Sequence, residues 1–227
     1  MFKILRKEEW SPNVYAMDIE APRVAKKAQA GQFIVLRVNE EGERIPLTIA
    51  DFDRETGRIL IVFQAIGAST MELAALEAGD SILDFVGPLG RPSEIAKLDG
   101  TMVVVGGGIG VAPTYPIARS MKDAGNKVIA IMGAKTKDIL IMEDEMKAAG
   151  VDSWDGWFGS FAKEVQDVEL SAAGEYEAIN RLAGFIITKL HPHPLRFTTL
   201  RMFWRNPHHL AGNGIFIGLI HNLKQHI

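Results

Sequence analysis

One glycine-rich stretch has the residue types and spacing to hold a phosphate. In "TMVVVGGGIGVAP" (101–113), three successive glycines and a fourth at Gly110 lie between an apolar run and Pro113. A glycine loop between a strand and a helix lets backbone N–H groups approach a phosphate at the helix N-terminus, where the helix dipole adds attraction. The alternative is a tight turn that only packs a helix on a sheet, although three glycines exceed what packing needs.

The loop departs from two common nucleotide-binding patterns. Counting G-x-G-x-x-G from Gly106 places Val111 at the third glycine, and counting from Gly108 places Pro113 there. No acidic residue stands in "IMGAKT", where a ribose-binding Asp or Glu is expected, and no Lys-Ser/Thr pair follows the loop. The choice between NADH and NADPH stays open, because Lys135 can meet a 2′-phosphate or simply be solvated.

Residues 1–97 have the pattern of a β-barrel. A single helix is expected over 69–76, where Ser69-Thr70-Met71-Glu72 fits a capping box and Gly79 follows the helix end. Short segments rich in β-branched and aromatic residues alternate with turn signals, at 2–6, 14–20, 32–38, 44–50, 58–64 and 80–87. Six strands at this spacing predict a closed or nearly closed barrel.

Residues 98–150 have the pattern of an α/β domain. "MVVV" is a continuous apolar run, typical of a strand buried on both faces of a parallel sheet. A helix is expected from Pro113 to Gly125, followed by the strand "KVIAIMG" and a further helix that ends at Gly150. This β-α-β-α order predicts the opening of a doubly wound nucleotide-binding sheet.

The bulk composition excludes several classes of protein. The 227 residues suffice for one large or two small domains, and a net charge of −3 gives no case for a nucleic-acid partner or an anionic membrane. The absence of cysteine excludes disulfides, thiol catalysis and cysteine-ligated zinc or iron–sulfur clusters in this chain. No signal-peptide pattern or membrane-length apolar run is visible, so we expect a cytoplasmic protein.

Residues 151–227 differ from the preceding residues in composition and hydrophobic pattern, and we leave their fold unassigned. All six histidines lie between His191 and His226, and no clean alternation of strands and helices is visible. This abrupt change favours a shifted reading frame or a fusion over gradual divergence. A metal site at His191/His193 or His208-His209 lacks cysteine or carboxylate partners at suitable spacing. The acidic run 143–145 is expected to be a solvated helix face.

"GGGIGVAP" resembles the nicotinamide-nucleotide loop of the ferredoxin–NADP reductase superfamily, in which a flavin-binding barrel of Greek-key type directly precedes the loop. The barrel of that superfamily carries an Arg-x-aromatic-Ser/Thr motif, and the matching stretch here is "RIPLTI" (44–49). Pro46-Leu47 in place of the aromatic residue resembles one branch over residues 1–150. That branch contains the electron transfer subunit of dihydroorotate dehydrogenase B and the FAD-bearing small subunit of NADH-dependent ferredoxin:NADP oxidoreductase.

The resemblance implies a set of cofactor-binding residues, with no catalytic side chain and no metal ligand. Arg44 would pair with a flavin phosphate, and Thr48 would hydrogen-bond the flavin ring. The rest of the implied flavin site comprises Pro46, Leu47 and Ile49 beside the ring and Gly67, Ser69 and Thr70 at the pyrophosphate. The implied nicotinamide-nucleotide site comprises Gly107, Gly108, Ile109, Gly110, Ala112 and Pro113.

The function implied is that of a flavoprotein oxidoreductase subunit. It would move hydride from NAD(P)H to FAD and pass electrons singly to a larger subunit in a heterodimer, or to ferredoxin or a similar carrier. The [2Fe-2S] cluster that the family holds in a cysteine-rich segment is not expected here. Three alternatives stay open: a non-catalytic flavin- or partner-binding module, a dihydroorotate dehydrogenase electron transfer subunit, and a histidine-rich metal-binding regulator.

Overall fold

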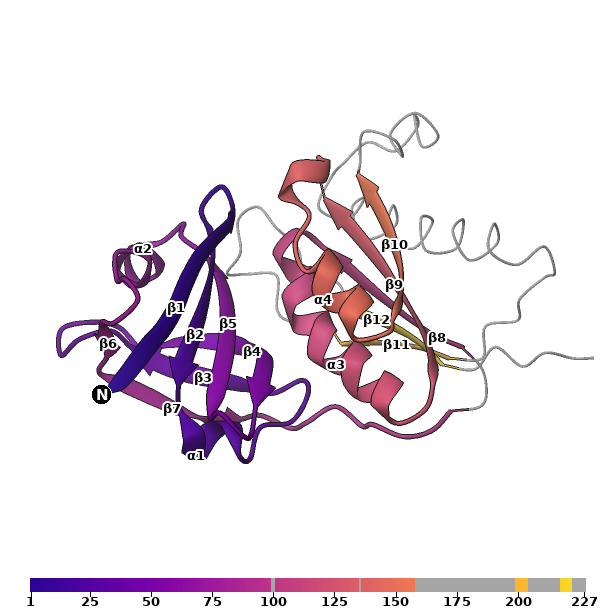
Figure 1. The fold of residues 1–227 in the computed structure, drawn as a ribbon, viewed down its shortest axis with the longest axis horizontal. Helices are drawn as coiled ribbons and strands as arrows, with labels where there is room; N and C mark the ends of the chain where they lie inside the picture. The colour runs from indigo at the N-terminus through magenta and orange to yellow at the C-terminus, as the bar shows by residue number, and fades with distance from the viewer. Residues whose placement is uncertain (99–100, 135, 158–198, 204–216, 222–227) are drawn as a thin grey trace, which may run out of the picture.

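The computed structural model describes residues 1–98, 101–134, 136–157, 199–203 and 217–221. It has two halves side by side, a β-barrel and an α/β half, joined by an extended linker (Figure 1). The predicted domain boundary near residue 98 stays a prediction.

The first half is an antiparallel barrel of seven strands. They are β1 (Phe2–Ser11), β2 (Val14–Glu20), β3 (Phe33–Arg37), β4 (Ile45–Asp53), β5 (Arg58–Gln64), β6 (Ser81–Ile82) and β7 (Asp84–Leu89). The strand order is β6-β1-β2-β5-β4-β3-β7. Because only Leu83 separates β6 from β7, the two ends of the sheet meet and the barrel nearly closes. The predicted barrel is confirmed, and the sixth predicted strand divides so that β6 pairs with β1 and β7 with β3.

Two short helices interrupt the barrel strands. The sequence did not predict α1 (Pro22–Ala25), whereas α2 (Ala68–Ala74) corresponds to the expected helix but begins one residue earlier. The expected Ser69–Glu72 capping box is wrong. Gly67 is the N-cap and has no side chain to offer, so the Thr70 hydroxyl turns back to accept from the Gly67 backbone N–H at 3.0 Å. Glu72 instead accepts a hydrogen bond from the Asn39 side chain.

Alternation along the barrel strands separates two faces. Side chains such as Ile19, Ile49 and Ile61 point inward and are fully buried in the barrel core. The opposite faces of β2, β4 and β5 carry a second apolar surface, formed by Val14, Ala16, Ala50, Leu60 and Val62. This outer surface is available to pack against another layer of structure.

The second half begins with the predicted parallel unit. Its elements are β8 (Thr101–Gly107), the 3₁₀ turn η1 (Gly108–Gly110), α3 (Val111–Asp123), β9 (Lys127–Ala134), the 3₁₀ turn η2 (Lys137–Ile139), α4 (Glu143–Ala148) and β10 (Asp152–Trp157). Strands β8, β9 and β10 pair in parallel, which confirms the β-α-β-α order. The parallel sheet therefore extends one strand beyond Gly150, where the sequence analysis ended the domain.

Two strands of the histidine-rich segment complete this sheet. They are β11 (Thr199–Phe203) and β12 (Ile217–His221), and the order of the sheet is β10-β9-β8-β12-β11. The sequence analysis assigned no strand here, because β12 is too short to show a periodicity. β12 lies antiparallel to β8, whereas a doubly wound sheet has parallel neighbours at its centre. The α/β half is atypical at this edge, as expected.

Helix α3 joins the two halves. Its side chains at Val111, Tyr115 and Arg119 recur every fourth residue and so lie on one face of the helix. Val111, Ala112 and Tyr115 are buried in one apolar cluster with the outer residues of β2, β4 and β5. The outer face of the barrel and α3 therefore share a hydrophobic core, which holds the glycine loop against the barrel.

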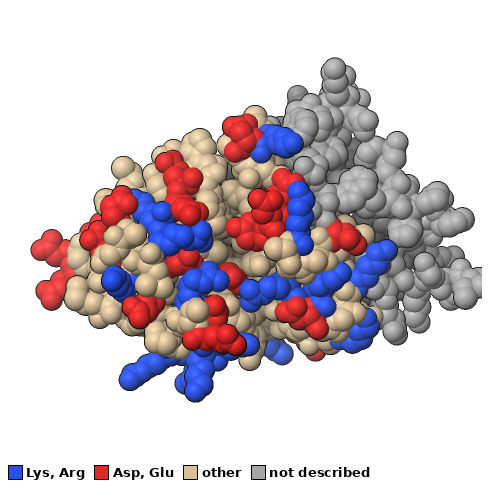
Figure 2. Space-filling view, in the orientation of Figure 1, with Lys and Arg blue, Asp and Glu red and all other residues tan. Residues whose placement is uncertain are grey.

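The surface of the described residues shows no large area of one charge on the face seen in Figure 2. Basic and acidic side chains are interspersed over the barrel and over α3. Among the helices that the structure describes, none is both long enough and apolar enough to cross a membrane.

Asn126 anchors the linker between the halves. Its side chain is buried, accepts a hydrogen bond from the Leu98 N–H at 2.7 Å, and donates to the carbonyls of Ala96 at 2.9 Å and Met121 at 2.8 Å. One amide side chain thus ties the last residues of the linker to the end of α3.

The substitution Asn126→Ala tests this anchor. We expect a loss of about 2 kcal/mol in the free energy of unfolding, because buried backbone groups lose their partners. Urea unfolding followed by circular dichroism measures the change, with Lys127→Ala at the neighbouring exposed position as the control. Equal midpoints for the two variants would contradict the assigned role.

Candidate cofactor site at the junction of the two halves

Three of the predicted flavin-site residues share one face of the barrel. Arg44, Pro46 and Thr48 alternate with Ile45 and Leu47, which pack against the barrel core. Since side chains alternate across a strand, the first three point to the outer surface. Pro46 is exposed and Thr48 is half-buried. The Arg44 guanidinium therefore lies two positions before the exposed Pro46, and the Thr48 hydroxyl lies two positions after it.

Arg44 is held in place by an acidic residue that the sequence analysis did not single out. Its guanidinium lies 3.3 Å from the Asp84 carboxylate on β7, and 61% of the side chain is exposed. The same carboxylate oxygen accepts from Arg37 on β3 at 2.8 Å. Two arginines thus flank one carboxylate, which orients Arg44 and leaves much of its guanidinium open to an anion. The signal in the sequence was a charged residue inside the apolar segment "ILDFVG".

Leu47 and Ile49 lie differently from the other residues of the motif. Leu47 packs against the barrel core, and Ile49 is fully buried in it. Their side chains stabilise β4 from within. Their contact with a cofactor on the outer face stays a prediction, and for Ile49 it would have to be made through the backbone.

The first turn of α2 lies beside the chain that leads into β4. Ser69 donates from its hydroxyl to the Glu43 carboxylate at 3.0 Å, one residue before Arg44. Thr70 is occupied with the helix cap at Gly67. The structure therefore brings the first turn of α2 close to the residue before Arg44. Binding of a pyrophosphate by Gly67, Ser69 and Thr70 stays a prediction.

The glycines of the loop have different surroundings. A Cβ on Gly106 would stand 2.9 Å from the Val111 Cα, so this position is glycine because β8 and α3 pack tightly there. A Cβ on Gly107 would find its nearest neighbour, the Gly133 carbonyl, at 4.0 Å, and one on Gly108 would find no atom within 4 Å. The left-handed backbone of Gly108, with a φ of +52°, favours glycine there whatever the space. Gly107 has no such requirement, so packing and backbone conformation do not explain the open space in front of it.

The remaining loop residues pack against the protein interior. Gly110 and Ala112 are buried, Ile109 packs against the core that the halves share, and Pro113 is half-buried in the first turn of α3. Of the six predicted nucleotide-site residues, Gly107 and Gly108 therefore have the most open surroundings. The others fix the position of the loop.

The glycine loop and the strand β4 that carries Thr48 both lie near the contact between the halves. The turn η1 lies against β5, and α3 lies against β4. Thr48 stands two residues from Ala50, which is buried in the core shared with α3. Two residues of an extended strand span about 7 Å, so Thr48 lies at the margin of the contact that α3 makes.

One titratable group in this contact is perturbed. Burial raises the pKa of the Tyr115 hydroxyl, the nearby Asp51 carboxylate adds to the effect, and Arg119 opposes it. Tyr115 is therefore a neutral packing residue at physiological pH. Among the described residues no group of three or more metal-ligating side chains occurs, and the histidine pairs of the sequence analysis lie outside the described ranges.

The chain is similar to flavoenzyme subunits of known sequence and structure, although no established family profile matches it. It is 48% identical to a dihydroorotate dehydrogenase B electron transfer subunit homolog of Thermotoga maritima, over 64% of this chain and 51% of the relative. The electron transfer subunit of dihydroorotate dehydrogenase B (NAD(+)) from Bacillus cereus (strain Q1) is 32% identical, over 72% of this chain and 67% of the relative.

A solved structure gives the same result. The NADH-dependent reduced ferredoxin-NADP oxidoreductase, described in connection with flavin-based electron bifurcation, matches with a TM-score of 0.66 and 45% identity, over 69% of this chain and 56% of that one. The chain spans about half the length of the curated relatives that it matches at about 50% identity. The extent of these matches and the two-part fold show that this chain belongs to the ferredoxin–NADP reductase superfamily, in the family of the dihydroorotate dehydrogenase B electron transfer subunits.

Proposed function

We propose that this chain is a flavoprotein electron-transfer subunit that binds FAD on the outer face of β4 and accepts hydride from NAD(P)H. The observation that supports this most strongly is the meeting of two features at one junction. Arg44, Pro46 and Thr48 point outward from β4, and the open glycines 107 and 108 lie on the loop that α3 holds against the same barrel.

The residues present fit these two ligands. A largely exposed guanidinium at Arg44, oriented by Asp84, suits a phosphate group. Space in front of Gly107 and Gly108 lets backbone N–H groups approach a second phosphate at the start of the 13-residue helix α3. The Thr48 hydroxyl can donate to or accept from a polar ring edge.

The protein's part in the chemistry is positioning. Bound flavin would supply the ability to take up a hydride and release electrons singly. Arg44 would hold the phosphate end of the dinucleotide, and Thr48 would orient the ring. The glycine loop would bring the nicotinamide nucleotide to the same junction. No side chain has to act as a general acid or base.

The electrons must leave through a partner. Cysteine is absent, so no iron–sulfur cluster held by thiolates can carry them within this chain. We propose a larger oxidoreductase subunit in a heterodimer as the acceptor, with ferredoxin or a similar carrier beyond it. The names of the relatives admit a dihydroorotate dehydrogenase as that larger subunit. A cytoplasmic location is proposed because the sequence shows no signal-peptide pattern.

A second function is favoured by one observation. Because the chain lacks cysteine, and so has no thiolate-held cluster to carry electrons onward, it can also be a module that binds flavin or a partner without turnover. The barrel with Arg44 and Thr48 is complete in the structure, whereas the α/β half ends in an atypical strand pair. The two functions differ in whether NADH reduces the bound flavin.

The first experiment is an anaerobic absorption spectrum of the purified chain reconstituted with FAD, before and after addition of NADH and, separately, NADPH. We expect a bound flavin whose visible absorbance bleaches, because the proposed flavin and nucleotide sites would bring both ligands to one junction. Bound flavin that stays oxidised with both nucleotides would support the module without turnover. Failure to bind FAD at all would refute both.

The substitution Arg44→Ala tests the phosphate anchor. Loss of a charge-assisted hydrogen bond is worth about 2 kcal/mol, so we expect FAD to bind roughly 30-fold more weakly. Titration of the apoprotein with FAD by flavin fluorescence measures the change. Arg23→Ala, at an exposed arginine on α1, is the matched control. Unchanged FAD affinity in Arg44→Ala would remove this residue from the site.

The glycine loop offers a matched pair of substitutions. Gly107→Ala meets open space, so we expect normal folding and normal FAD content but NADH binding weakened about tenfold or more. Gly106→Ala meets the α3 backbone, so we expect it to destabilise the fold by about 1–3 kcal/mol. Thermal unfolding and the NADH dependence of flavin reduction separate the two effects. A Gly107→Ala protein with unaltered NADH binding would place the nucleotide elsewhere.

A further inference from the structure

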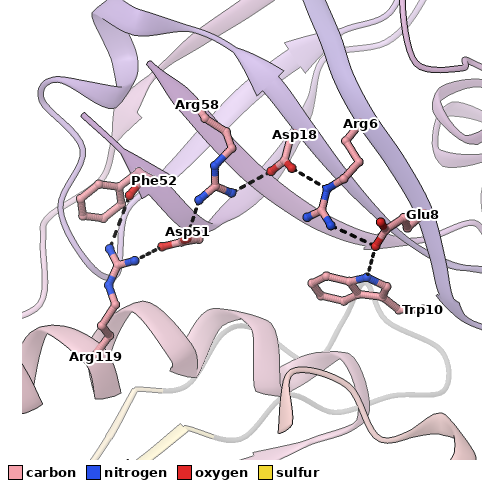
Figure 3. Close-up of polar contacts among 8 residues, drawn as sticks. All are labelled: Arg6, Glu8, Trp10, Asp18, Asp51, Phe52, Arg58 and Arg119. Atoms are coloured by element: carbon pink, nitrogen blue, oxygen red, sulfur yellow. Dashed lines mark hydrogen bonds and ion pairs between the residues drawn. The ribbon is translucent and has the colours of Figure 1, made fainter. Parts of the chain in front are cut away.

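A chain of alternating charges runs across the outer face of the barrel into α3 (Figure 3). Trp10 donates to Glu8, and Glu8 pairs with Arg6 at 3.1 Å. Arg6 pairs with Asp18 at 2.7 Å, and Arg58 bridges Asp18 and Asp51 at 2.8 Å to each. Arg119 then reaches Asp51 from α3. Within this series of described contacts, the last pair is the one that links a barrel strand to α3.

A bulge in β4 directs Asp51 toward α3. The register shifts between Ile49 and Asp51, where an extra residue enters β4 opposite β5. Ile49 and Phe52 belong to the barrel core, whereas Ala50 belongs to the core shared with α3 and Asp51 pairs with Arg119. Two successive side chains therefore point outward. A bulge of this kind re-aims a side chain, and here it aims a carboxylate at the helix of the other half.

Arg119 makes more contacts than the ion pair. Its guanidinium lies 5.3 Å from the Phe52 ring centre and 5.7 Å from that of Tyr115, and it approaches the Phe52 carbonyl at 3.5 Å. Asp51 is only 8% exposed and is shared with Arg58. Burial lowers the pKa of Arg58, but the hydrogen bonds and charges of Asp18 and Asp51 outweigh it and raise that pKa.

The position of this pair relates it to both predicted sites. Asp51 lies three residues beyond Thr48 on β4, or about 10 Å along the strand. Arg119 lies nine residues beyond Gly110 on α3, or about 14 Å along the helix. A tilt of α3 by about 5° around this contact would move the glycine loop by about 1 Å, because a helix of this length behaves as a rod.

We infer that the Arg119–Asp51 pair is a positioning contact that sets the glycine loop relative to the flavin strand and so governs hydride transfer. The inference rests on the proposed function and extends it to residues that touch neither cofactor. The apolar core between α3 and the barrel is non-directional, so it brings the halves together without defining one angle. The Arg119 guanidinium contacts the Asp51 carboxylate, the Phe52 carbonyl and two aromatic rings, and these directional contacts fix the angle of α3 on the barrel.

The test compares Arg119→Gln, Arg119→Lys and the control Arg6→Gln in the FAD-loaded protein. Arg6→Gln breaks the same chain of charges at its barrel end and leaves α3 untouched. We expect flavin reduction at saturating NADH to slow about 10- to 100-fold in Arg119→Gln, since a misplacement of about 1 Å can have that effect. Arg119→Lys should recover part of the rate, and Arg6→Gln should stay within about twofold of the unaltered chain. FAD content should be equal in all of them.

A second measurement does not depend on the flavin chemistry. The chain has no cysteine, so Lys3→Cys and Lys127→Cys introduce two unique labelling sites at exposed positions, one in each half. We expect pulsed electron paramagnetic resonance to give a narrow distance distribution in the parent and in Arg6→Gln, and a broader or shifted one in Arg119→Gln. If NADH does not reduce the flavin of the parent, the proposed function fails and this measurement alone decides the orienting role. Identical distributions in Arg119→Gln and Arg6→Gln, or identical reduction rates, would overturn the inference.

Discussion

The packing of α3 on the outer face of the barrel is the interaction on which the rest of this structure depends. The helix buries Val111, Ala112 and Tyr115 against side chains of β2, β4 and β5. Both faces of these strands are consequently buried where α3 covers them, one in the barrel core and one in the shared core. Strands β2, β4 and β5 therefore contribute side chains to the barrel core on one face and to the core shared with α3 on the other. The glycine loop begins where this helix begins, so its position follows from the same contact.

Closure of the barrel makes that wall stiff. β6 and β7 continue one another in sequence but pair at opposite ends of the sheet, with β1 and β3. A nearly closed sheet leaves few unpaired backbone groups at its edges, and it resists the shear that would shift β4 relative to β5. Arg44 depends on a neighbouring part of the sheet, because Asp84 at the start of β7 pairs across from Arg37 at the end of β3 and its carboxylate contacts both arginines. The pairing of β3 with β7 therefore places the carboxylate that orients Arg44.

Much of the fold and part of the candidate site could be predicted from the sequence. The features that could be predicted differ from those that could not for physical reasons. Strand periodicity and glycine placement are local, so the barrel strands, α3 and the glycine loop were all visible in the sequence. The bulge at Ala50 was not, because a bulge depends on which strand pairs opposite, and no local pattern records that. Asp51, Asp84 and Arg119 were not singled out from the sequence, since their partners lie 68 or 40 residues away in the chain. Leu47 and Ile49 were assigned to the flavin site because the family motif includes the whole stretch 44–49. Strand alternation alone would have directed both side chains toward the barrel core, where they lie.

The strand beside β8 has a consequence for how the molecule assembles. Val104 of β8 pairs with Leu219 of β12, so the two members of this pair are 115 positions apart in the sequence. In the barrel, β1 and β2 are joined by a two-residue turn, and β4 and β5 by a similarly short one. Loop-closure entropy makes contacts that are distant in sequence slow to form. The barrel can therefore reach its final form while β8 is paired with β9 but still lacks β12 on its other side. During synthesis the whole barrel leaves the ribosome well before β12 does.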